Sequence, residues 1–139
     1  MAALFEFRRK ARGLAVKANV VLVVEDEPLI RMIAVEMLAD AGWSVVEFAT
    51  ADEASVFCKQ LDNDIAAVFT DINVPGAMDG LGLAALVAAS RPTAAIVVTS
   101  GRYREPPAHL VDRVRFLPKP WDAQSLLAAI QKNDSEPSL

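Results

Sequence analysis

Cysteine is almost absent from this chain, and long apolar segments are missing altogether. The single cysteine, Cys58, excludes a disulfide framework or a cysteine metal site within the chain. No stretch approaches the roughly 18 uninterrupted apolar residues of a membrane span, and no apolar core of signal-peptide length precedes a cleavage site near the N-terminus. We therefore expect a cytoplasmic protein without a membrane span.

A general excess of basic residues is also missing. Residues 1–19 carry five basic residues and one acid, whereas residues 20–139 carry nine basic and seventeen acidic residues, so the two net charges are +4 and −8. The acidic body argues against a nucleic-acid partner. We expect a basic leader over residues 1–19, flexible or a short helix, a folded domain over residues 20–132 and a polar tail over residues 133–139.

Short apolar runs that end in a reactive or polar residue are the main feature that is present. Four such runs span residues 20–26, 65–71, 95–100 and 114–119. They are typical of buried strands in a parallel sheet. One more strand is predicted over residues 43–48, and helices are predicted over residues 28–40, 52–61, 81–90 and 122–132. The alternation predicts an α/β fold with a parallel sheet, right-handed crossovers and helices on both faces.

The connection between the last two strands, residues 102–113, departs from this regular alternation. It is short, and Pro106 and Pro107 forbid a continuous helix across them. A helix in this connection is expected to have little more than about two turns and to follow the prolines. The fourth helix of the fold is therefore predicted to be shortened.

Reactive side chains are predicted to meet at one edge of the sheet. Ligands of open α/β sheets bind outside the carboxyl ends of the strands, where Glu25, Asp26, Asp71, Thr99 and Lys119 are expected. Three neighbouring carboxylates repel one another, and a divalent cation such as Mg²⁺ relieves that repulsion. Asp71 can then act as a nucleophile toward a phosphoryl group, with the cation, Lys119 and the Thr99 hydroxyl covering the phosphoryl oxygens.

Taken singly, these residues are weak signals. An acidic tripeptide over residues 25–27 can simply cap a helix N-terminus, and a lone lysine is usually a surface residue. Lys119, however, follows a buried strand and lies between Pro118 and Pro120, and its bond to Pro120 is a candidate cis peptide. The combination with Asp71 favours a functional site.

Four segments resemble the receiver domain of two-component response regulators. They are Val-Val-Glu-Asp-Glu-Pro (23–28), Thr-Asp-Ile-Asn-Val-Pro-Gly-Ala-Met-Asp-Gly (70–80), Val-Val-Thr-Ser-Gly (97–101) and Phe-Leu-Pro-Lys-Pro (116–120). Each motif is weak alone, but four in order at strand ends are specific, and the resemblance spans about residues 20–132. It implies a doubly wound, flavodoxin-like sheet with strand order 2-1-3-4-5.

The resemblance also implies a role for each matching residue of the site. Asp71 is expected to be the phosphoacceptor. Asp26 and Asp71 would bind Mg²⁺ directly, Glu25 would act through water, and the backbone carbonyl of Asn73 would supply another ligand. Lys119 would contact the phosphoryl group.

Two further residues would form the switch of a receiver domain. Thr99 would be the hydroxyl drawn toward the phosphoryl group, and Phe116 the aromatic partner that changes rotamer with it. Ser100 is the neighbouring alternative, and Thr99 is preferred because it directly follows the apolar run. Without the resemblance, Phe116 would be interpreted as a core residue. The loop after Asp71 is one residue longer than the commonest receiver pattern.

The function implied by the resemblance is that of a stand-alone receiver. It would accept a phosphoryl group from a histidine kinase or a histidine phosphotransfer protein, and signal by contact with an unknown downstream protein or act as a phosphate sink. A homodimer is possible. The domain would not be an enzyme beyond its own phosphorylation and dephosphorylation.

Two alternatives remain open on the residues alone. An aspartate-nucleophile phosphatase of the haloacid dehalogenase type also uses an aspartate, Mg²⁺ and a lysine. Such enzymes usually carry a second acid two residues after the nucleophile, where this chain has Asn73. The other alternative is an interaction module on the same fold that is not phosphorylated.

Overall fold

The structure is a computed structural model that describes residues 19–60, 65–107 and 112–131. Five parallel strands form one sheet in the order β2-β1-β3-β4-β5. The strands are β1 (Val20–Val24), β2 (Ser44–Phe48), β3 (Ala67–Asp71), β4 (Ala95–Ser100) and β5 (Val114–Pro118). The helices are α2 (Pro28–Asp40), α3 (Ala51–Gln60), α4 (Gly80–Ser90) and α5 (Ala123–Gln131). The predicted doubly wound fold and its strand order are confirmed.

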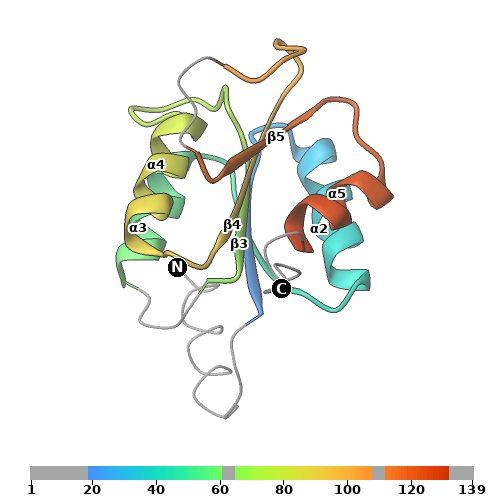
Figure 1. The fold of residues 1–139 in the computed structure, drawn as a ribbon, viewed down its shortest axis with the longest axis horizontal. Coiled ribbons are helices and arrows are strands. Elements are labelled where there is room, and N and C mark those ends of the chain that lie inside the picture. The colour runs from blue at the N-terminus through green and yellow to red at the C-terminus, as the bar shows by residue number, and fades with distance from the viewer. Residues whose placement is uncertain (1–18, 61–64, 108–111, 132–139) are drawn as a thin grey trace.

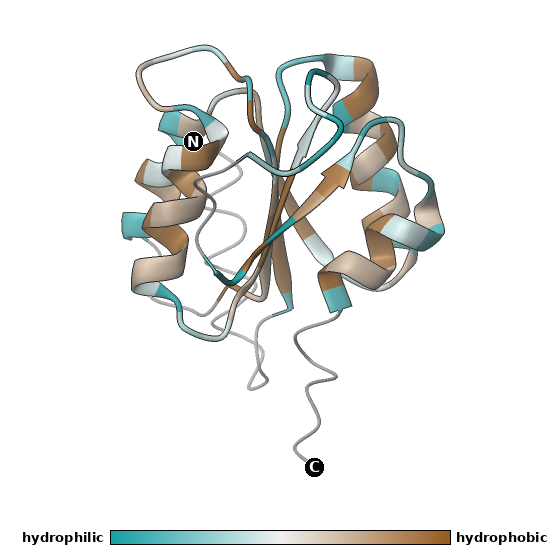
Figure 2. Ribbon diagram, turned by 45° about the horizontal axis from the view of Figure 1, so that its top comes forward, coloured by the Kyte–Doolittle hydropathy of each residue, from teal (hydrophilic) through white to brown (hydrophobic). Residues whose placement is uncertain are grey.

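Two helical layers enclose the sheet. Helices α3 and α4 cover one face, and α2 and α5 cover the other (Figure 1). Strands β1, β3 and β4 are buried along their whole length, so their side chains alternate between two hydrophobic clusters. Figure 2 shows these apolar strands between the two layers. This explains why the central strands appear in the sequence as continuous apolar runs.

Helix α2 begins and ends where the sequence predicts. Pro28 occupies the first turn, where a missing N–H costs no intrahelical hydrogen bond. After the last residue, Gly42 has a positive φ of 101° and donates its N–H to Ala39 O at 3.0 Å, while Trp43 N donates to Leu38 O at 3.1 Å. These two bonds form a Schellman motif, which turns the chain directly into β2.

Carboxylates cap two other helices. Asp79 accepts a hydrogen bond from Gly82 N at 2.9 Å, so α4 starts at Gly80, one residue before the predicted start. Asp122 accepts from Ser125 N at 2.8 Å at the start of α5, and its hydrogen bonds to Ser125 lower the pKa of Asp122. Both caps fix the direction in which the chain leaves the edge of the sheet.

The connection from β4 to β5 is irregular over residues 101–107. The short helix predicted after the prolines falls partly on residues 108–111, which lie outside the described residues. The leader over residues 1–18 and the tail over residues 132–139 lie outside them as well. None of the described helices has both the length and the apolar character needed to cross a membrane.

Candidate phosphoryl and metal site

The carboxyl ends of the parallel strands bring the predicted residues together. Glu25 and Asp26 directly follow β1, Asp71 is the last residue of β3, and Lys119 follows β5. Asp71 is in register with Thr99 of β4. The predicted gathering at one edge is therefore confirmed, and it follows from the parallel direction of the strands.

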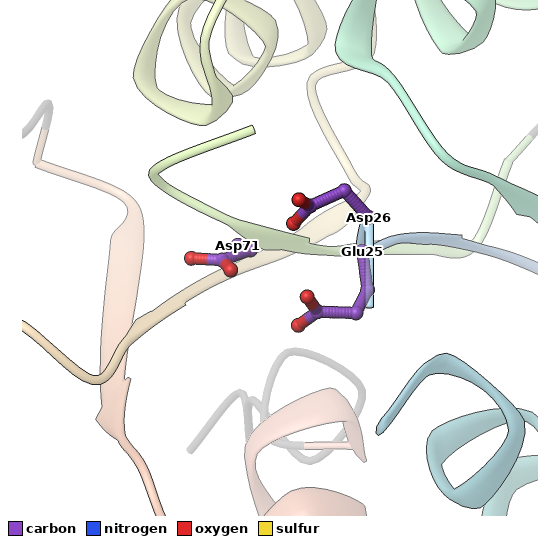
Figure 3. A group of neighbouring side chains, drawn as sticks. All are labelled: Glu25, Asp26 and Asp71. Carbon is purple, nitrogen blue, oxygen red and sulfur yellow. The ribbon is translucent and has the colours of Figure 1, made fainter. Parts of the chain in front are cut away.

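Three carboxylates form the centre of the site. One carboxylate oxygen from each of Glu25, Asp26 and Asp71 lies within 4.8 Å of the other two. Glu25 and Asp71 are buried, whereas Asp26 is exposed. Figure 3 shows the three side chains facing one region, with Glu25 and Asp26 diverging from the end of β1. The cluster is thus open to solvent on the side of Asp26.

Lys119 supplies a positive charge between two of these acids. Its Nζ donates to Glu25 Oε1 at 2.9 Å and to Asp71 Oδ2 at 3.1 Å, and its side chain is only 18% exposed. Burial of the ammonium acts to lower the pKa of Lys119, but the hydrogen bonds to both carboxylates outweigh it and raise the pKa above its ordinary value. The lysine is therefore fully charged at neutral pH.

The site retains negative charge despite the lysine. Burial raises the pKa of Glu25, and the nearby charge of Asp71 acts in the same direction, although bonds from Lys119 and from Glu27 N at 3.1 Å oppose it. The ammonium of Lys119 bonds the two buried acids, Glu25 and Asp71, whereas no bond from it to the exposed Asp26 is found among the described residues. Oxygen donors with excess negative charge are the set that Mg²⁺ prefers, so these residues fit the metal.

The chain just after Asp71 is held close to the site. Asn73 is exposed and donates its N–H to Asp71 Oδ1 at 3.2 Å. Gly80 N donates to Ile72 O at 2.9 Å, and a Cβ at Gly80 would collide with the backbone carbonyl oxygen of Asp71. A glycine is thus required here because α4 starts against the end of β3.

The hydroxyls of Thr99 and Ser100 have different surroundings. Both residues are buried, but Thr99 Oγ1 has no hydrogen-bond partner among the described residues, whereas Ser100 Oγ accepts from Arg102 N at 3.0 Å and Tyr103 N at 3.4 Å. Ser100 therefore caps the turn after β4. A buried hydroxyl without a partner costs free energy, and Thr99 is the one whose hydroxyl is available to a ligand at Asp71.

Phe116 does not share a face of the sheet with Thr99. It pairs with Val98 and packs, partly buried, against the cluster under α3 and α4. Thr99 pairs with Leu117, which packs against the opposite cluster under α2 and α5. Any coupling between Thr99 and Phe116 therefore passes through the backbones of β4 and β5 or around their ends.

Several contacts of the site were not predicted. Arg31 of α2 donates to the backbone oxygen of Glu25 at 2.8 Å and to Glu47 Oε1 at 3.0 Å. Asp52 of α3 accepts hydrogen bonds from the loop after Asp71. The sequence Ser100-Gly101 at the end of β4 indicates a turn. Arg31 and Asp52 lie on helices, and their local sequence does not indicate these contacts. The predicted cis peptide between Lys119 and Pro120 is confirmed.

This fold and this arrangement of acids and lysine define a receiver-type α/β domain. The family model for the response regulator receiver domain matches residues 21–131, so the chain belongs to that family.

Two curated relatives place the domain in different proteins. The transcriptional regulatory protein PdtaR of Mycobacterium tuberculosis is 32% identical over 117 residues, which are 80% of this chain and 54% of PdtaR. The sensor kinase CckA of Brucella abortus is 30% identical over 126 residues, 88% of this chain and 13% of CckA. The chain thus spans about half of PdtaR and a small part of CckA.

Solved structures agree with the family. A response regulator receiver protein from Sinorhizobium medicae has a TM-score of 0.76 at 25% identity, covering 86% of this chain and 96% of that one. The receiver domain of the hybrid histidine kinase CckA has a TM-score of 0.69 at 29% identity, covering 82% and 97%. TrrA from Thermotoga maritima, solved in complex with Mg²⁺-BeF, has a TM-score of 0.69 at 25% identity, covering 85% and 99%.

Proposed function

We propose that Asp71 accepts a phosphoryl group in a Mg²⁺-dependent manner and that the domain signals through the resulting change. The bridge from Lys119 Nζ to Glu25 and Asp71 carries this proposal, because it places a fixed cation beside the proposed nucleophile within a cluster of three acids. The Mg²⁺-BeF complex of TrrA supports the same chemistry here.

The residues have distinct parts in the proposed transfer. An oxygen of Asp71 attacks phosphorus, a P–O bond forms, and the bond to the donor's leaving group breaks. Lys119 is already hydrogen-bonded to Asp71, and its ammonium can donate to a phosphoryl oxygen once that group is bound to Asp71. The Thr99 hydroxyl, buried and without a partner, can donate to a second oxygen. Asp26, Glu25, Asp71 and the Asn73 carbonyl would hold the metal, which neutralises the remaining charge when bound.

The partners are also proposals. The donor would be a histidine kinase or a histidine phosphotransfer protein, whose P–N bond breaks as Asp71 is phosphorylated. CckA supports the link because it joins a receiver of this kind to a sensor kinase. The downstream partner, a homodimer and a cytoplasmic location remain predictions.

Incubation with acetyl phosphate and Mg²⁺ tests the proposal directly. Intact-mass measurement should show the gain of one phosphoryl group in the wild type and no gain in Asp71→Asn. Asp26→Asn is the matched variant for the metal, since it also removes one charge but keeps the nucleophile; its phosphorylation should need more Mg²⁺. An unchanged gain in Asp71→Asn, or steady turnover of a generic phosphate ester, would overturn the assignment.

A further inference from the structure

Asp52 is the unpredicted residue with the most direct link to the loop that follows Asp71. Its carboxylate accepts hydrogen bonds from Ala77 N at 3.0 Å and Met78 N at 3.2 Å, 25 and 26 residues away in the chain. A side chain of α3 therefore holds the middle of the connection between β3 and α4.

The shape of the loop is matched to this carboxylate. Gly76 has a positive φ of 116°, and a Cβ at Gly76 would collide with Asp52 Oδ2. A positive φ also presents successive backbone N–H groups to one acceptor, which suits an anion. The loop is thus folded around Asp52 and is not merely near it.

Asp52 itself is rigidly held. Thr50 caps α3, with its Oγ1 accepting from Glu53 N at 3.2 Å, and the Ser55 hydroxyl donates to Asp52 O at 3.1 Å. The start of a helix is also a favourable place for a negatively charged side chain. Helix α3 can therefore serve as a fixed anchor for the loop.

The ends of the loop are anchored separately. Asn73 N donates to Asp71 Oδ1, and Gly80 N donates to Ile72 O. Between them, residues 74–79 form a span whose exposed tip is tied to the rest of the protein through Asp52. Release of the tip would leave Asn73 held by its N–H bond to Asp71 and by its buried neighbours Ile72 and Val74, and the loop would lose one of its restraints.

We propose that Asp52 is a positioning residue for the metal site, which fixes the loop tip against α3 and so holds the Asn73 carbonyl where Mg²⁺ is bound. This inference rests on the proposed function, because Asn73 is a metal ligand only there. It assigns no chemical step to Asp52.

Two measurements on the full chain test it. In metal-free protein, Asp52→Ala should raise the hydrogen-exchange rates of the Ala77 and Met78 amides by about tenfold, as expected on loss of a hydrogen bond to a charged group. The Mg²⁺ affinity, measured by calorimetric titration, should fall by about tenfold, the low end for loss of a group that orients a metal ligand. The phosphorylation rate at saturating Mg²⁺ should be unchanged.

Glu53→Gln is the matched control. Glu53 is the exposed neighbour of Asp52 in the same helical turn, so its loss removes the same charge but leaves the loop bonds intact. The control should leave both the exchange rates and the Mg²⁺ affinity near wild-type values. An equal fall in Mg²⁺ affinity in both variants would reduce the effect to charge and overturn the inference, as would unchanged exchange rates in Asp52→Ala.

A second variant, Gly76→Ala, tests the same contact from the loop side, and its single substitution leaves Asp52 in place. Gly76→Ala should weaken Mg²⁺ binding to a similar extent, and it should cost less in an Asp52→Ala background, where its methyl group meets no carboxylate. Equal costs in both backgrounds would contradict the contact. Failure of the wild type to bind Mg²⁺ would instead defeat the proposed function, and the two failures are therefore distinguishable.

Discussion

The two connections that border the site differ in how they are held. The β3–α4 loop, residues 72–79, is tied along its length through Asn73, Asp52 and the start of α4. The β4–β5 connection, residues 101–113, is exposed over residues 101–106 and is held by described contacts near its two ends.

This difference suits two separate tasks at one edge of the sheet, which are binding of the metal and response to phosphorylation. A loop that supplies a metal ligand has to be in place before the ligand arrives, and charged hydrogen bonds to the backbone achieve this. Residues 101–106, the described first half of the β4–β5 connection, are exposed, and an exposed segment can rearrange at lower cost than a segment tied to its surroundings. We therefore expect the β3–α4 loop to set the chemistry and the β4–β5 connection to carry the response.

Alanine substitutions at two glycines, one at each connection, are expected to differ most in stability. Gly80→Ala places a Cβ against the Asp71 carbonyl and 2.8 Å from Ile72 Cα, so it should lower the free energy of unfolding by about 3 kcal/mol. Gly101→Ala places its Cβ 3.7 Å from Lys119 Cδ, an ordinary contact, and should be nearly neutral. Urea unfolding of both variants measures this, and equal losses would contradict the contrast.

Lys119 directly follows β5 and contacts Asp71, the proposed phosphoacceptor. Lys119→Ala should slow phosphorylation by acetyl phosphate about a hundredfold, the usual cost of removing one donor to a transferred group. Mg²⁺ affinity should change far less, because all the oxygen ligands remain. Rates at saturating Mg²⁺ and a parallel Mg²⁺ titration check this; equal losses of both would count against the assigned role.

Arg113 fixes the far end of the β4–β5 connection. Its guanidinium donates to Ala88 O at 3.2 Å in the last turn of α4, and to Arg91 O at 2.6 Å and Ala94 O at 3.3 Å just after that helix. Arg113→Ala should cost about 2 kcal/mol of stability, as hydrogen bonds to charged groups do. The exposed Arg104 offers a matched Arg104→Ala control, expected to unfold like the wild type in thermal melts.

The near end of the same connection depends on Ser100. Ser100→Ala removes the acceptor for Arg102 N and Tyr103 N and should cost about 1 kcal/mol. Thr99→Val removes a hydroxyl without a partner and should not destabilise the protein. Chemical denaturation of the pair decides the matter, since a larger loss in Thr99→Val would mean that its hydroxyl is already engaged.

The smallest expected effect is a pH dependence at Glu25. Burial raises the pKa of Glu25 above 4.5, so the folded protein binds this proton more tightly than the unfolded chain. Its contribution to stability is complete below pH 4.5 and declines as pH rises through the folded pKa. Without metal, the stability of the wild type relative to Glu25→Gln should fall over that range. Added Mg²⁺ should abolish the fall, and a rise without metal would contradict the prediction.

Most of the fold was predictable because local signals and the global fold agree. Continuous apolar runs predicted the buried central strands, and the helix predicted over residues 28–40 has the bounds of α2. Helix α4 starts at Gly80, one residue before the predicted start, because Asp79 caps it. Strand β3 begins at Ala67 instead of Ile65 and extends to Asp71.

Only the site residues at or directly after the ends of strands could be predicted from the sequence. Parallel strands bring their carboxyl ends together, so Asp71 and Lys119 could be paired from the sequence. Asp52 and Arg31 reach the site from helices, and nothing in their local sequence indicates which backbone groups they contact. Such contacts depend on the path of a loop, which hydrophobic periodicity does not describe.

The ion pair between Lys119 and Glu25 joins residues 94 positions apart, at the two ends of the folded chain. During synthesis, β1 leaves the ribosome long before β5, and the acids of the cluster have no lysine until the last strand has docked. A nascent or truncated chain would therefore present an acidic cluster without its counter-charge. If Lys119 has the proposed role, we expect the full rate of phosphorylation at Asp71 only after β5 has docked.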